Sequence, residues 1–280
     1  MSNTQALYIA FGGCQVAVSA KNPEVIATLR QWFSAMLVLE DSCIVAYFEV
    51  SGDREQYDLL KCGKAIHLNL TQLQLLITLK YEVIMALIRA RSDLLWFHAG
   101  AVANGGGVVL LPAQAGGGKS TLVTKLVAQG WQYLSDDVVP LDLKTVKVFP
   151  VPQTPRVREQ IEEKLPPNKL FKLNKTDVEI VSERLCQQAM PIQAIVFPTY
   201  DVDVATELAL VSPGNTVLEL LRNCVNFTEH KHRAMDCLTN LVQQVPAAKL
   251  LYHNSDRAIA ILIDWYKKQF NEQNSSTARD

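Results

Sequence analysis

The chain has 280 residues, of which 49% are hydrophobic and 20% are charged, a composition that excludes a disordered chain. Its formal net charge of −1 provides no overall field that would attract a nucleic acid or an anionic membrane. No apolar stretch reaches the roughly 18 residues that a membrane-spanning helix needs. We therefore expect a soluble, cytoplasmic protein that binds neither nucleic acid nor membrane.

The cysteines fit a reducing compartment. No two of them form a CxxC pair, and their spacing matches neither a zinc site nor a disulfide framework. We expect free thiols at all six positions, which are Cys14, Cys43, Cys62, Cys186, Cys224 and Cys237.

Residues 1–95 predict a small N-terminal α/β domain. Alternating residues flank Gly12-Gly13, a pattern that favours a β-hairpin. Two stretches have apolar residues at helical spacing, and Asn22 and Thr71 precede them as candidate N-caps. The predicted elements are a hairpin within 7–19, a helix over 23–39, strands over 43–50 and 67–70, and a helix over 71–95.

Residues 96–270 predict a second α/β domain, which begins a new cycle of strands and helices. Turn residues 104–107 favour a hairpin between its first two strands, and Gly130 ends the helix that follows them. The predicted strands cover 97–103, 108–111, 131–135, 192–197 and 248–252, and the predicted helices cover 121–129, 213–224, 234–245 and 257–270. Residues 141–151 predict a hairpin edge, 152–174 a loop with short helical pieces, and the polar residues 271–280 a disordered tail.

The segment between Val108 and Thr121 carries the strongest functional signal. An apolar strand leads into a glycine-rich turn, and Lys119-Ser120 then opens a helical pattern, the order that a phosphate-binding loop needs. Ala113 occupies the first glycine of the pattern GxxxxGK[ST], and alanine is tolerated there if its φ stays negative. The candidate nucleotide-binding residues are Ala115, Gly116, Gly117, Gly118, Lys119, Ser120 and Thr121.

The residue types in this loop indicate separate roles. Backbone N–H groups of the three glycines would surround the phosphate oxygens, and Lys119 would contact the β- and γ-phosphates. The hydroxyl of Ser120 would bind Mg²⁺. The alternative is a glycine-rich strand-to-helix turn without a ligand.

Asp136-Asp137 follows the next predicted strand. One carboxylate of such a pair can bind Mg²⁺ while the other points at an acceptor hydroxyl. The alternative is an acidic turn after a strand. His98, on the strand before the loop, is by itself no more than a core or turn histidine.

Taken together, these residues resemble a known family. The motifs Phe97-His98-Ala-Gly-Ala-Val102, the glycine-rich loop, and Gly130-Trp-Gln-Tyr-Leu-Ser-Asp-Asp137 occur in the order and spacing of bacterial HPr kinase/phosphorylase catalytic domains. The Leu-Pro-Ala approach to the loop and residues 191–198 are more similar to the HPr-kinase-related proteins often encoded beside peptide-modification genes. The resemblance covers roughly residues 95–265 and implies a P-loop kinase domain of the HPr kinase and phosphoenolpyruvate carboxykinase type.

The resemblance also implies roles for single residues. Asp136 would be the catalytic base, Asp137 a Mg²⁺ ligand together with Ser120, and His98 and Lys119 catalytic residues. The bifunctional enzymes carry a further signature rich in Glu, Arg and Gly, which is not found here. Arg156 and Arg158 are its nearest counterparts as candidate phosphate ligands, with a solvated basic loop as the alternative.

The sequence therefore predicts an ATP-dependent, Mg²⁺-requiring kinase that acts on a hydroxyl group. The resemblance implies a serine of a protein or peptide as the acceptor, and it implies a homo-oligomer. A small-molecule alcohol is the alternative acceptor. A non-catalytic nucleotide-binding component of a peptide-modification system is the alternative function.

Overall fold

The computed structural model describes residues 5–40, 43–52, 56–158 and 175–276. It is a mixed α/β protein with several sheets, as the sequence predicts. The chain divides into two compact units, one of residues 1–93 with 152–154 and one of residues 94–151 with 155–280. Among the described residues, no helix combines the length and the hydropathy needed to cross a bilayer.

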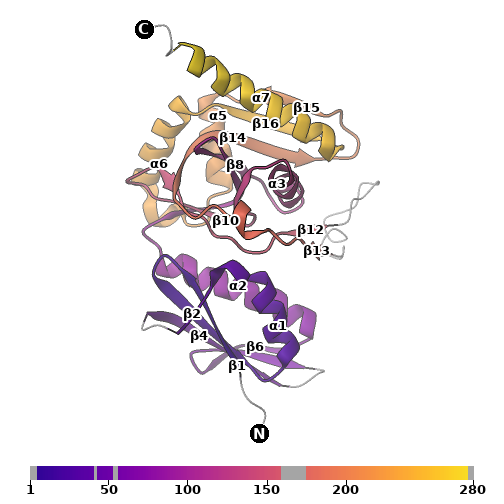
Figure 1. Ribbon diagram of the computed structural model, residues 1–280. Coiled ribbons are helices and arrows are strands. Elements are labelled where there is room, and N and C mark those ends of the chain that lie inside the picture. Colours follow the sequence, from indigo (N-terminus) through magenta and orange to yellow (C-terminus); the bar gives the residue numbers. More distant parts are fainter. Residues whose placement is uncertain (1–4, 41–42, 53–55, 159–174, 277–280) are drawn as a thin grey trace. The chain divides into compact units, whose positions relative to one another are not determined.

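The first unit is a six-stranded sheet with strand order β3-β1-β2-β4-β5-β6. Only β2 and β4 pair in parallel within it, and helices α1 and α2 pack against the sheet (Figure 1). Its elements are β1 (Gln5–Phe11), β2 (Cys14–Ala20), α1 (Pro23–Trp32), β3 (Leu37–Val38), β4 (Ile44–Gly52), β5 (Tyr57–Lys61), β6 (Lys64–Leu70) and α2 (Gln72–Ala90).

Local chemistry explains where these elements begin and end. Gly12 and Gly13 both have positive φ, as a tight hairpin turn between β1 and β2 requires. Asn22 and Thr71 are confirmed as N-caps, because each side chain accepts a hydrogen bond from a backbone N–H of the first helical turn. The α2 helix ends at Ala90 and not at residue 95 as predicted, because Arg91 turns to donate to Asp93 and to the carbonyl of Gly12.

The second unit is built on an eight-stranded sheet. Its strand order is β11-β10-β7-β8-β14-β16-β15, and β9 pairs with β7. The strands are β7 (Leu95–Asn104), β8 (Gly107–Pro112), β9 (Gln132–Ser135), β10 (Val138–Leu141), β11 (Lys147–Val148), β14 (Met190–Tyr200), β15 (Glu207–Leu210) and β16 (Ala247–Tyr252). A separate hairpin is formed by β12 (Arg156–Arg158) and β13 (Lys175–Asp177).

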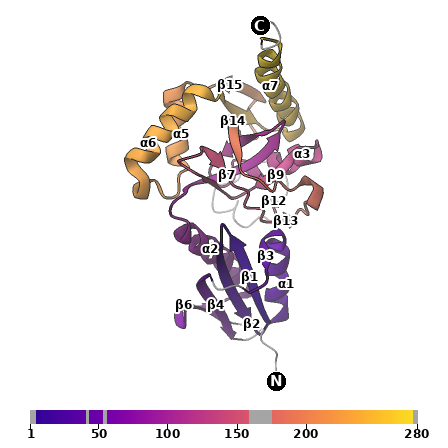
Figure 2. The ribbon, with the colours of Figure 1, turned by 60° about the vertical axis from the view of Figure 1, so that its left-hand side comes forward.

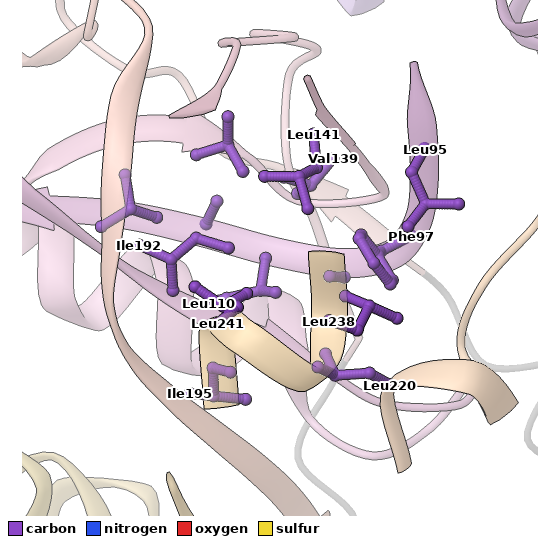
Figure 3. Close-up of a cluster of buried hydrophobic side chains, with 14 of the residues drawn as sticks. Leu95, Phe97, Leu110, Val139, Leu141, Ile192, Ile195, Leu220, Leu238 and Leu241 are labelled. Carbon is purple, nitrogen blue, oxygen red and sulfur yellow. The ribbon is translucent and has the colours of Figure 1, made fainter. Parts of the chain in front are cut away.

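Helices cover both faces of this sheet (Figure 2). They are α3 (Lys119–Ala128), α5 (Pro213–Arg222), α6 (Phe227–Gln244) and α7 (Ser255–Ser276). Because side chains alternate along a strand, β7 and β8 contribute residues to two separate hydrophobic clusters. Leu110 packs with Leu220 and Leu238 on the α5–α6 face (Figure 3), whereas Leu111 packs with Leu122 and Leu262 on the α3–α7 face.

Three further helices differ from their predicted bounds. The α1 helix ends at Trp32, seven residues before its predicted end, because Leu37 and Val38 pair with β1 as the strand β3. The α6 helix begins at Phe227, seven residues before the predicted start, and it passes a kink at Lys231, where φ is 37°. The α7 helix continues through Ser276, into the segment for which the sequence predicts disorder. Residues 277–280 lie outside the described part of the chain.

Residues 152–174 also differ from the predicted loop with short helical pieces. Residues 152–154 belong to the first unit, where the Thr154 backbone N–H and hydroxyl donate to the carbonyls of Trp32 and Gln31. Residues 156–158 form β12 in place of a helical piece, because pairing with β13 satisfies their backbone. Residues 159–174 lie outside the described part of the chain.

Candidate phosphate-binding and catalytic site

The glycine-rich loop connects β8 to α3, and its glycines are required by backbone and packing. Gly116 and Gly118 have φ values of 94° and 86°, a region that other residues rarely adopt. A Cβ atom at Gly118 would also collide with the hydroxyl of Tyr252, which donates a 3.2 Å hydrogen bond to the Gly118 carbonyl. Ala113 is not among the described residues with positive φ, which explains why alanine is accepted in place of the first glycine.

The loop is suited to hold an anion because it ends at the N-terminus of α3. The first N–H groups of a helix have no partners within the helix, and the helix dipole favours negative charge there. A Cβ atom at Gly117 would lie 2.9 Å from the Cβ of Ala113, which is too close for two carbon atoms. Only glycine therefore fits at this position without a shift of the loop. The Gly117 N–H donates to the Gln114 carbonyl at 3.1 Å, so this one predicted phosphate donor is engaged within the loop.

Lys119, the first residue of α3, is buried and extends back over the loop. Its Nζ donates to the carbonyl of Ala113 at 2.6 Å and to that of Gln114 at 3.3 Å. The same Nζ lies 3.0 Å from Nε2 of His98. Burial lowers the pKa of Lys119 to about 8, against the opposing effect of the Asp136 and Asp137 charges.

His98 links the lysine to the aspartate pair. Its Nδ1 lies 3.0 Å from the backbone oxygen of Asp137 and 3.5 Å from Oδ1 of the same residue. Burial and the charge of Lys119 lower the pKa of His98, which favours the neutral ring. In the tautomer that satisfies both contacts, Nδ1–H donates to the Asp137 carbonyl and Nε2 accepts from Lys119.

The aspartate pair lies at an interruption between two strands. Residues of β9 and of β10 both pair with β7, at Ala101–Ala103 and at Leu95–His98 respectively. Asp136 and Asp137 fill the gap, opposite Ala99 and Gly100, and the hydroxyl of Ser135 spans it by donating to the Val138 carbonyl at 2.6 Å. The interruption therefore places two consecutive carboxylates beside the loop.

The two carboxylates have different environments. Asp136 is buried, with 9% of its surface exposed, whereas 43% of the Asp137 side chain is exposed. The charges of both carboxylates oppose the lowering of the Lys119 pKa by burial. Two neighbouring carboxylates in unlike surroundings can take different roles, one in proton transfer and one in binding a cation.

The structure brings together four of the predicted catalytic and metal residues, and two cations act on them, the predicted Arg158 and the unpredicted Lys175. Lys119, His98, Asp136 and Asp137 share the contacts and charge interactions described above. The charges of Arg158 and Lys175, from β12 and β13, also act on Lys119. Lys175 is missed by sequence reasoning because nothing in its neighbourhood marks it as part of a site.

Arg156 is placed differently from Arg158. Its Nε lies 2.8 Å from Oδ1 of Asp177 on the paired strand, and both side chains are largely buried. Arg156 therefore has a partner within the hairpin, whereas the charge of Arg158 acts on Lys119.

Ser120 and Thr121 occupy the first turn of α3, where predicted Mg²⁺ and phosphate ligands are expected. Within the described residues, no group of three or more His, Cys, Asp or Glu side chains is arranged to hold a metal ion. A hydroxyl and a carboxylate, from Ser120 and Asp137, fit Mg²⁺, which takes one or two protein oxygen ligands together with phosphate oxygens and water. The donor set therefore suits a cation that arrives with a nucleotide.

No protein-family model matches this chain, and a comparison with curated protein sequences finds no match. Among solved structures, the HPr(Ser) kinase/phosphatase from Coxiella burnetii is similar with a TM-score of 0.34 and 12% sequence identity. The similarity covers 62% of this chain and 97% of that one. A similarity this weak assigns no activity to the chain.

Proposed function

We propose that this chain is an ATP-dependent, Mg²⁺-requiring kinase that transfers the γ-phosphoryl group to a serine hydroxyl of a protein or peptide. One observation carries the proposal. Lys119 at the start of α3 is 3.0 Å from His98, which in turn contacts Asp137, beside the buried carboxylate of Asp136. A phosphate-binding helix terminus and a candidate base are thereby held in one small region.

Each residue has a defined task in this reaction. The acceptor oxygen bonds to the γ-phosphorus while the bond from that phosphorus to the β–γ bridging oxygen breaks, and ADP leaves with the electron pair. The hydroxyl proton passes to the carboxylate of Asp136. Lys119 and the N-terminal N–H groups of α3 stabilise the phosphate charge, and His98 positions Lys119.

Ser120 and Asp137 would hold the Mg²⁺ ion, which supplies positive charge against the phosphate oxygens when it is bound. The exposed side of Asp137 leaves this position open to a nucleotide. A cytoplasmic location, where ATP is abundant, belongs to the same proposal.

The accessibility of the site favours a protein or peptide over a small alcohol. About a third of the His98 side chain and 43% of that of Asp137 are exposed. A small-molecule kinase usually encloses its acceptor in a pocket that excludes water. Because Asp136 itself is only 9% exposed, an acceptor loop of a macromolecule would approach it past the more exposed His98.

The test is transfer of label from [γ-³²P]ATP with Mg²⁺ to candidate proteins and peptides, with free serine and small alcohols in parallel reactions. We expect phosphoserine in a macromolecule. Label in a small alcohol alone would support the small-molecule kinase. ATP binding without transfer to any acceptor would support a non-catalytic nucleotide-binding protein.

A further inference from the structure

A shallow cavity, widely open to solvent and separate from the catalytic contacts, lies between α3 and the β12–β13 hairpin. Its volume is about 360 Å³, within the range of small-molecule sites. The residues that matter to the argument are Thr121, Thr124, Ala128, Val157, Arg158 and Val178. All of them belong to the second unit.

The position of the cavity relates it to the glycine loop. Thr121 lines the cavity and follows directly after Lys119 and Ser120. Residues two apart on an α-helix point about 200° away from each other around the axis, so Thr121 and Lys119 lie on opposite sides of α3. Thr124 and Ala128 extend the Thr121 face along the helix, and the cavity therefore continues away from the side that carries His98 and Asp136.

The γ-phosphate and the nucleoside of a nucleotide bound at this loop would lie on different sides of α3. Its γ-phosphate has to lie near Lys119 and Asp136, where the acceptor hydroxyl is activated. Its nucleoside is joined through the α-phosphate and has to leave the loop on the side away from the acceptor. The cavity beside Thr121 lies on that side.

The lining suits a flat, weakly polar ring with an anionic attachment. Val157, Val178 and Ala128 provide apolar walls. The Thr124 hydroxyl donates to the helix carbonyls of Ser120 and Thr121, so it contributes its methyl group rather than a free polar group.

Arg158 supplies positive charge at this position; Lys125 also lines the cavity, but its Nζ is paired with Asp256. Arg158 lines the cavity, and its charge also contributes to lowering the pKa of Lys119. A guanidinium can stack on a base or pair with a phosphate.

We propose that the cavity between α3 and the β12–β13 hairpin binds the base and ribose of the nucleotide whose phosphates occupy the glycine loop. This inference rests on the proposed nucleotide-dependent function. It assigns to the β12–β13 hairpin the recognition of the nucleoside, with Val157 and Val178 against the base and Arg158 at the junction with the phosphates.

The test uses ATP and tripolyphosphate, which carries the same number of phosphates without a nucleoside. Val178→Trp fills the cavity, whereas Val181→Trp makes the same change at a residue that is 58% exposed and outside the cavity. Titration calorimetry of the full chain in the presence of Mg²⁺ measures both affinities. We expect Val178→Trp to bind ATP at least tenfold more weakly than the wild type does. The affinity of Val178→Trp for tripolyphosphate should stay unchanged. The affinities of Val181→Trp for ATP and for tripolyphosphate should also equal those of the wild type.

The outcomes separate this inference from the proposed function. Unchanged ATP affinity in Val178→Trp, or a wild type that binds ATP no better than tripolyphosphate, would overturn the nucleoside pocket and leave the kinase proposal intact. A wild type that binds neither ligand would overturn the proposed function itself. If Val178→Trp lowers the melting temperature, Ala128→Trp fills the same cavity from the exposed end of α3 and should give the same loss of ATP affinity.

Discussion

The two sides of α3 differ in what they offer a ligand. On one side, Lys119, His98 and Asp137 form a connected set of polar contacts next to the buried Asp136. On the other side, Ala128, Val157 and Val178 give the cavity apolar walls, and Arg158, Lys125 and three threonines also line it. Under the proposed function, the first side would perform the chemistry and the second would provide binding energy. Changes on the first side should therefore affect turnover, and changes on the second should affect affinity.

Replacement of the candidate base should have the largest effect. Asp136→Asn keeps the size of the side chain but cannot accept the acceptor proton, so we expect kcat to fall by roughly 10²- to 10⁴-fold. ATP affinity should be retained, because the phosphate contacts remain. Lys119→Ala is the matched comparison and should weaken both ATP binding and transfer. Labelled transfer and calorimetry measure the two quantities, and full activity in Asp136→Asn would remove the assignment of the base.

Buried charge on the same side should make stability depend on pH. Folding lowers the pKa of Lys119 from 10.5 to about 8, so between these values the unfolded chain binds more protons and stability rises with pH. The resulting increase in the free energy of unfolding is absent below about pH 8 and reaches roughly 3 kcal/mol near pH 10.5. The free energy of unfolding in urea at pH 7.5 and pH 10, compared between the wild type and Lys119→Met, isolates this contribution. Equal pH dependence in the two proteins would contradict it.

Two variants of His98 should separate its contacts. His98→Gln can still offer an acceptor to Lys119 near the Nε2 position, whereas His98→Asn can donate only toward the Asp137 carbonyl. If His98 acts by positioning Lys119, His98→Asn should lower kcat by about ten- to a hundredfold and His98→Gln by clearly less. Steady-state kinetics with kcat and KM resolved provides the measurement. The reverse order would assign the role to the Asp137 contact.

The smallest effect is expected on the binding side. Asp177→Asn removes the charge that pairs with Arg156 across β12 and β13, a partly buried contact that should contribute about 1 kcal/mol at most. A less rigid hairpin should raise the Kd for ATP a few-fold and leave kcat unchanged. Calorimetry measures the Kd for ATP, and kinetics at saturating ATP measure kcat. A fall in kcat would show that the hairpin takes part in chemistry as well as in binding.

The sequence predicts best what is local. The order of strand, glycine turn, Lys119 and helix, and the N-caps Asn22 and Thr71, depend on neighbouring residues, and the structure contains them. The contact between Lys119 and His98 could not be derived in this way, because it depends on the register of β7 against β8 and β10.

Other features had even weaker signals. The strands of β12 and β13 have three residues each and are rich in charge, so neither alternation nor β-propensity marks them. The first turns of α6, from Phe227 on, are not predicted because the residues around the kink at Lys231 are polar and show no apolar residues at helical spacing. Residues of both short strands line the cavity, so the sequence pattern does not predict it.

The hydrogen bond from Tyr252 to the Gly118 carbonyl connects two points that are 134 residues apart in the chain. Burial raises the pKa of Tyr252, so its hydroxyl stays protonated and can donate this bond. During synthesis, the glycine loop leaves the ribosome long before Tyr252 does, and Asn223, whose carbonyl accepts from the His98 backbone, also emerges late. We expect the nascent chain to acquire nucleotide affinity only once β16 has been made, and any fragment that ends before β16 to lack it.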